Sequence, residues 1–170
     1  MAVLPTNGQI GKAEVRREAS HAPQLSTDFL NRYSEALMLI EIALDDETIL
    51  DDLRAWRAVG YRAHFEASPL RCAASAIAAY DGLSPARRRA FESVCTSMSR
   101  LVTTVTALLA EGRGNAELPM IVEVASEALR RLITRSTQFI NANGRADIET
   151  FEGGSLQHEI DAFLAVHKVG

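Results

Sequence analysis

Two long stretches of the chain place apolar residues at the period of an α-helix. Between Ser84 and Glu111, and again between Pro119 and Asn143, apolar side chains recur every three or four positions. An α-helix has 3.6 residues per turn, so this spacing gathers them on one face. Residues 112–118 leave room only for a turn, which makes the two helices antiparallel neighbours. The pattern therefore predicts a long antiparallel helix hairpin.

Shorter segments with the same period precede the hairpin. They predict a helix over 26–44, a second over 45–59 and a third over 68–80, which begins at the start signal Ser68-Pro69. Residues 61–67 could add a further turn. No segment alternates as a strand does, and Ala and Leu are frequent. The expected fold is all-α, a bundle of about five to six helices.

The pattern also divides the chain. Residues 1–25 are polar and aperiodic, which predicts a disordered N-terminal arm. Residues 26–144 form the helical bundle domain. Residues 145–170 are expected to be a linker with a C-terminal amphipathic helix that starts at Ser155. A chain of 170 residues is long enough to bury one core of this kind.

Composition narrows the classes of function. The net charge is −4 and the pI about 5.6, which disfavours nucleic acid and anionic membranes as partners. No apolar run has the length of a membrane span, and no leader peptide is visible. The two cysteines, Cys72 and Cys95, lie far apart and form neither a metal-type pair nor a disulfide framework. We expect a cytoplasmic protein with reduced thiols.

Searches for catalytic motifs give little. The sequence has no phosphate-binding loop, no nucleophile elbow and no zinc-protease motif. The Glu-x-x-His spacing of di-metal bundles occurs only at Glu18 and His21, in the predicted arm. We therefore expect no metal, no cofactor and no enzymatic activity.

Glu41 is the most unusual carboxylate, because it lies within an otherwise apolar run, residues 37–44. One hypothesis makes it a functional group in a buried polar or ligand site inside the bundle, near Trp56. The favoured alternative places it at the margin of the apolar stripe, paired with an arginine such as Arg54, Arg57 or Arg62.

His64 begins the string His64-Phe65-Glu66-Ala67-Ser68-Pro69-Leu70. Its spacing resembles the H-box of sensor histidine kinases, where Ser/Thr-Pro-Leu follows the phosphorylated histidine on a kinked helix. The resemblance would make His64 the acceptor of a phosphotransfer protein. Phe65 departs from the acidic residue usual in that family, and the chain is too short for an ATP-binding domain. The favoured alternative is a half-buried structural histidine.

The predicted helix 84–111 carries two further features. Arg87, Arg88 and Arg89, with Arg71 nearby, suggest either an acidic partner or a solvated face. Hydroxyl residues lie mostly off its apolar stripe, so that this face either packs against another helix or chain or is a neutral surface. A homodimer through helix faces is consistent with the first option. The hydroxyl residues are Ser93, Thr96, Ser97, Ser99, Thr103, Thr104 and Thr106.

The last predicted helix contains the string 156–164, Leu-Gln-His-Glu-Ile-Asp-Ala-Phe-Leu. It resembles the N-terminal peptide of the flagellar motor switch protein, which docks as a short helix on a chemotaxis receiver domain. The resemblance implies a receiver domain as partner. The partner-binding candidates are Gln157, Glu159, Ile160, Asp161, Phe163 and Leu164. The alternative is a helix packed on its own bundle.

Together these features favour a non-enzymatic regulatory or adaptor protein that acts through protein–protein interaction. The two resemblances, at His64 and at 156–164, both point to receiver-type signalling partners. The alternatives are a histidine phosphotransfer protein that uses His64 and a helical bundle that binds a small ligand.

Overall fold

The structure, a computed structural model, describes residues 22–112 and 114–148 together with positions 158, 162, 165 and 166. Within these residues the protein is all-α, with no strand. The predicted fold class is confirmed.

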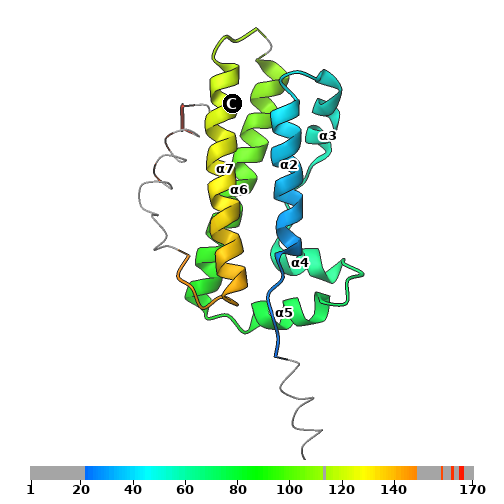
Figure 1. Ribbon diagram of the computed structural model, residues 1–170, viewed down its shortest axis with the longest axis vertical. Helices are drawn as coiled ribbons and strands as arrows, with labels where there is room; N and C mark the ends of the chain where they lie inside the picture. The colour runs from blue at the N-terminus through cyan, green and yellow to red at the C-terminus, as the bar shows by residue number, and fades with distance from the viewer. Residues whose placement is uncertain (1–21, 113, 149–157, 159–161, 163–164, 167–170) are drawn as a thin grey trace, which may run out of the picture.

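The described helices follow the chain in a simple order (Figure 1). The short 3₁₀ helix η1 leads into α2, and η2 leads into α3. Two short helices, α4 and α5, precede the two long ones, α6 and α7. The bounds are η1 Thr27–Leu30, α2 Asn31–Ile42, η2 Glu47–Ile49, α3 Leu50–Ala55, α4 Tyr61–Glu66, α5 Ala73–Asp81, α6 Pro85–Glu111 and α7 Leu118–Asn141.

The hairpin of α6 and α7 is the longest feature of the fold, as predicted. α6 begins where Ser84 Oγ accepts the backbone N–H of Arg87 at 3.3 Å, with Pro85 in the first turn. α7 ends before Gly144, whose φ of +72° lies in the left-handed region. α2 runs beside both helices, so the three form the body of the molecule, while α4 and α5 lie across one end (Figure 1).

Two predicted helices differ from the observed ones. The helix expected over 45–59 ends at Ala55, because Trp56 turns to an extended conformation and its indole N–H donates to Arg32 O at 3.1 Å. The helix expected from Ser68 starts only at Ala73, since Ser68 Oγ accepts the Leu70 N–H and holds a turn. Residues 61–66 form a full helix, α4, rather than a single turn.

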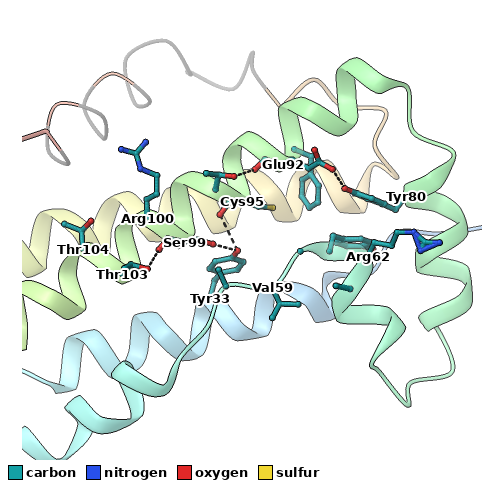
Figure 2. A pocket seen from close by; sticks show the side chains of 16 residues that line it. Tyr33, Val59, Arg62, Tyr80, Glu92, Cys95, Ser99, Arg100, Thr103 and Thr104 are labelled. Atoms are coloured by element: carbon teal, nitrogen blue, oxygen red, sulfur yellow. Dashed lines mark hydrogen bonds between the residues drawn. The ribbon is translucent and has the colours of Figure 1, made fainter. Parts of the chain in front are cut away.

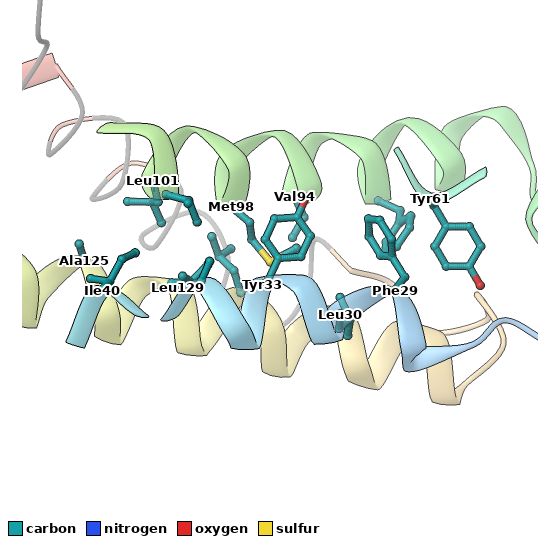
Figure 3. Packing of buried hydrophobic residues seen from close by; sticks show 14 of the residues in the cluster. Phe29, Leu30, Tyr33, Ile40, Tyr61, Val94, Met98, Leu101, Ala125 and Leu129 are labelled. Carbon is teal, nitrogen blue, oxygen red and sulfur yellow. The ribbon is translucent and has the colours of Figure 1, made fainter. Parts of the chain in front are cut away.

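The core lies where α2, α6 and α7 meet (Figure 3). It contains an aromatic centre in which the Phe29 ring lies 5.2 Å from Tyr61 and 6.3 Å from Phe91, measured between centroids. Aromatic pairs in this range stabilise a core beyond their buried area. The core also includes Leu25 and Ile148, just outside the predicted domain limits of 26 and 144.

By length and composition alone, α6 could cross a membrane, and it is the one such helix among the described residues. Core helices pass the same test. The apolar stripe of α6, from Phe91 to Leu109, is buried in this core, which is the arrangement of a core helix.

Candidate functional site

A groove of about 760 Å³ lies between α6 and the segment 58–63, which comprises the end of the link from α3 and the first turn of α4 (Figure 2). Its floor comes from α2 and the aromatic centre, and α5 closes one end through Tyr80. The lining residues used below are Tyr33, Tyr80, Glu92, Ser99, Arg100 and Thr103. We call this the α6 groove.

Tyrosine hydroxyls tie the floor of the groove to α6. Tyr33 donates to Cys95 O at 3.3 Å, and its oxygen lies 2.9 Å from Ser99 Oγ. Tyr80 hydrogen-bonds the carboxylate of Glu92. Burial raises the pKa of Tyr33 to about 12, so the phenol stays neutral and keeps its proton to donate. These bonds hold the side chains of Tyr33 and Tyr80 against α6.

The wall of the groove on α6 is the hydroxyl-rich face of that helix. Thr96 Oγ1 donates to Glu92 O and Thr103 Oγ1 donates to Ser99 O, each at 2.9 Å. Because these two threonines each donate their single proton to their own helix, they present methyl groups and oxygen lone pairs to the groove. Such a wall is less strongly hydrated than one of Glu and Lys. Part of the predicted hydroxyl face therefore borders a cavity.

Opposite charges lie along the rim. Glu92 and Arg100 are exposed and two turns apart on α6. Across the groove, the Arg62 guanidinium lies 2.6 Å from Glu66 Oε1 and 3.4 Å from Asp81 Oδ1, at 45% side-chain exposure. The groove is thus a mostly apolar channel with an acidic group and a basic group at separate points on one wall.

The cysteines give the site no nucleophile. Cys95 lines the groove, but burial raises the pKa of its thiol far above the usual range. Cys72 is exposed and lies outside the groove lining, with its Sγ 3.8 Å from Ser26 Oγ.

His64 lies on α4, away from the groove lining, as a half-buried residue. Its Nε2 is 3.1 Å from Asp28 Oδ2, and its ring contacts Phe29 and Phe65. A carboxylate at this nitrogen would repel an incoming phosphoryl group. α4 ends at Glu66, so that His64 and Ser68-Pro69 do not share the continuous helix that the H-box resemblance implied. The contact with Asp28 instead fixes η1 to α4.

Glu41 and Trp56 do not meet in one site. Glu41 is exposed, which argues against the hypothesis of a buried functional carboxylate. It pairs with an arginine, as the favoured alternative has it, but with Arg130 of α7 rather than with Arg54, Arg57 or Arg62. Its place at the edge of α2, beside α7, explains how it interrupts an apolar run. Trp56 packs against Tyr33 at a centroid distance of 5.7 Å, next to the groove floor but outside its lining.

The arginine cluster is partly structural. The Arg88 guanidinium donates to Asp81 O at 2.8 Å and lies over the Tyr80 ring at 5.4 Å. It therefore fastens α5 to the start of α6. Arg71, Arg87 and Arg89 are exposed.

The C-terminal candidates, Gln157, Glu159, Ile160, Asp161, Phe163 and Leu164, lie outside the described residues. Of this segment the structure describes four positions, which are helical and exposed: His158, Ala162, Ala165 and Val166.

The sequence did not predict the opposite wall of the groove. The hydroxyl run pointed to α6, but residues 58–63 and Tyr80 carry no local pattern that marks them as its neighbours. Only the tertiary fold brings them together, because α4 and α5 pack across the end of the bundle.

Within the described part of the chain, no group of three or more His, Cys, Asp or Glu side chains could hold a metal ion. Comparison with protein-family models, with curated proteins and with solved structures found no match.

Proposed function

We propose that this protein is a non-enzymatic regulator or adaptor, and that the α6 groove binds a helical segment of a protein partner. The observation that carries the proposal is the groove itself. It combines a mostly apolar floor with a wall on which the hydroxyls of Thr96 and Thr103 already donate to their own helix. It holds no nucleophile–base pair among its lining residues, so binding is the chemistry that these residues support.

The dimensions and charges favour a helix as the occupant. From Glu92 to Thr104 the groove follows α6 for about 18 Å, the length of about twelve helical residues. Side chains of Thr, Ser and Cys along α6 let a second helix approach closely. The exposed carboxylate of Glu92 suits the positive end of the helix dipole, and Arg100 suits its negative end.

A small ligand is the second candidate, because a volume of about 760 Å³ also falls within the range of small-molecule pockets. The ligand-binding alternative drawn from the sequence had its site near Glu41 and Trp56, whereas this candidate uses the groove, which neither residue lines.

A receiver domain remains the partner class that the 156–164 resemblance suggests. That part of the proposal rests on the sequence alone. The helix 155–167 would be a second contact, separate from the groove.

The experiment that tests this proposal fills the groove with a large side chain. Thr103→Trp places a large ring over the channel, and Thr134→Trp is the matched control. Both threonines are exposed and both donate to the carbonyl four residues earlier, but Thr134 lies on α7. Displayed helical peptides are selected on the full chain, and their affinities are measured by fluorescence anisotropy. We expect Thr103→Trp to weaken binding at least about tenfold, the loss of one central contact, and Thr134→Trp to leave it unchanged.

Equal affinities for the two variants would reject the groove as the binding site. If no helical peptide is selected, but small compounds raise the melting temperature of the wild type and not of Thr103→Trp, the small-ligand candidate replaces the helix.

A further inference from the structure

Most of the large exposed apolar side chains belong to two helices that pack against each other, α2 and α7. Among the described residues, seven large apolar side chains are exposed, and five of them lie in the last turns of α2, just after α2, or in the first two turns of α7. Their exposed fractions run from 39% for Leu44 to 60% for Met120. We call these five the turn-end surface: Met38, Ile42, Leu44, Met120 and Val124.

A small cavity of about 280 Å³ lies beside this surface, and of the five residues Leu44 lines it. Ala43 and Leu44 line it from the end of α2, and Leu118 and Pro119 line it from the start of α7. Ile42 and Met120 are the chain neighbours of this lining. The cavity has room for one aliphatic or aromatic side chain, so the surface offers both a contact area and an anchoring position.

The surroundings of the turn-end surface are strongly acidic. Residues 41–48 and 109–124 contain seven carboxylates and one arginine, a net of six negative charges. The whole chain carries only −4, so the remainder is slightly positive. One of these carboxylates, Glu41, pairs with Arg130 of α7, so that the two segments keep an acidic excess. Asp45, Glu117 and Glu123 are exposed there.

We propose that the turn-end surface binds a basic amphipathic helix of a protein partner. The apolar side of the helix would lie on Met120 and Leu44, with one side chain in the cavity, and its lysines and arginines would face the carboxylates. Two of the five apolar residues are methionines, whose unbranched side chains adapt to different partners. A second copy of this chain fits poorly, because two acidic ends would repel one another.

This surface is separate from the α6 groove, since the two share no lining residue. The inference goes beyond the proposed function and stands without it. If both hold, the bundle has two binding surfaces, which is what an adaptor needs.

The experiment uses the full chain and a synthetic amphipathic helical peptide of leucine and lysine, with a glutamate-for-lysine peptide as its charge-reversed counterpart. We expect the lysine peptide to bind, more weakly as salt is added, and the glutamate peptide not to bind. Leu44→Gln and Met120→Gln should each weaken binding about tenfold or more. Leu70→Gln is the matched control, because Leu70 is 42% exposed against 39% for Leu44 and lies in the turn between α4 and α5.

Several outcomes would overturn the proposal. The first is that the lysine peptide fails to bind, and the second is that it binds Leu44→Gln, Met120→Gln and Leu70→Gln equally. The third is that the glutamate peptide binds as well as the lysine peptide. A dimer in sedimentation that Leu44→Gln disperses would also overturn it, since the surface would then belong to a second copy. Circular dichroism of each variant confirms that these surface changes leave the fold intact.

Discussion

At the scale of single residues, buried phenols are the most constrained polar groups in this protein. Burial, the largest cause in each case, raises the pKa of Tyr33 and of Tyr61 to about 12, and raises that of Tyr80 as well. The chain has no other tyrosine. All three contribute to the groove or to the aromatic centre beneath it.

These pKa shifts predict how stability depends on pH. In the unfolded chain a tyrosine ionises near pH 10. Because the folded pKa is higher, this contribution is fully present below about pH 10 and is lost as the pH rises toward 12. We expect tyrosinate absorbance to appear only together with the loss of helical circular dichroism. A tyrosine that ionises near pH 10 in a fully helical protein would contradict this.

Gly144 offers a second test at the residue scale. Its φ is +72°, and a Cβ added there would lie 2.3 Å from Leu83 Cδ2. Gly144→Ala should therefore destabilise the protein by about 2–4 kcal/mol, through backbone strain and overpacking. Gly60→Ala is the control, because a Cβ at Gly60 meets nothing within 4 Å. It should leave stability unchanged or raise it by up to about 1 kcal/mol. Urea unfolding measures both, and equal midpoints would refute the prediction.

Single residues were also where sequence reasoning was weakest. For Glu41 the favoured prediction was a place at the margin of the apolar stripe beside an arginine. At 44% side-chain exposure it does pair with an arginine, but that arginine is Arg130. Most of the apolar run around it does lie in α2, but only Ile40 and Ala43 of that run are buried, while Met38, Ile42 and Leu44 are exposed. The run could not reveal that α7 supplies the partner, because that contact joins residues far apart in the chain.

At the scale of elements, the sequence predicted helix bounds well where a start signal and a long apolar stripe occurred together. Ser84-Pro85 and the long apolar stripe placed α6 within a residue of its observed start. The same Ser-Pro signal failed at Ser68, where the serine caps a turn and α5 begins at Ala73. In this chain, the Ser-Pro signal marks the start of a helix only where a long amphipathic stripe follows it. Packing of that stripe supplies most of the stability of a helix.

α6 belongs both to the hydrophobic core and to the candidate binding site. One face carries the core residues from Phe91 to Leu109, and an adjacent face forms the hydroxyl wall of the groove. The sequence could indicate that the second face is unusual, because its hydroxyls replace the expected charges. It could not indicate a cavity, because residues 58–63 reach that face only through the packing of α4 on η1, which includes the contact of His64 with Asp28.

At the scale of the whole molecule, the described helical body carries two surfaces of different chemistry. The α6 groove is a mostly apolar channel. The turn-end surface is apolar and framed by carboxylates. We therefore expect two classes of partner: a helix with apolar and small side chains for the groove, and a basic helix for the turn end.

The measurement that tests the central claim most directly is a map of amide chemical shifts, recorded on the full chain with and without a groove-selected helical peptide. The account predicts that the largest shifts fall on Thr96, Ser99, Thr103 and residues 58–63, while Leu44 and Met120 stay unchanged. Largest shifts at the turn end, or small shifts spread evenly over the bundle, would contradict it.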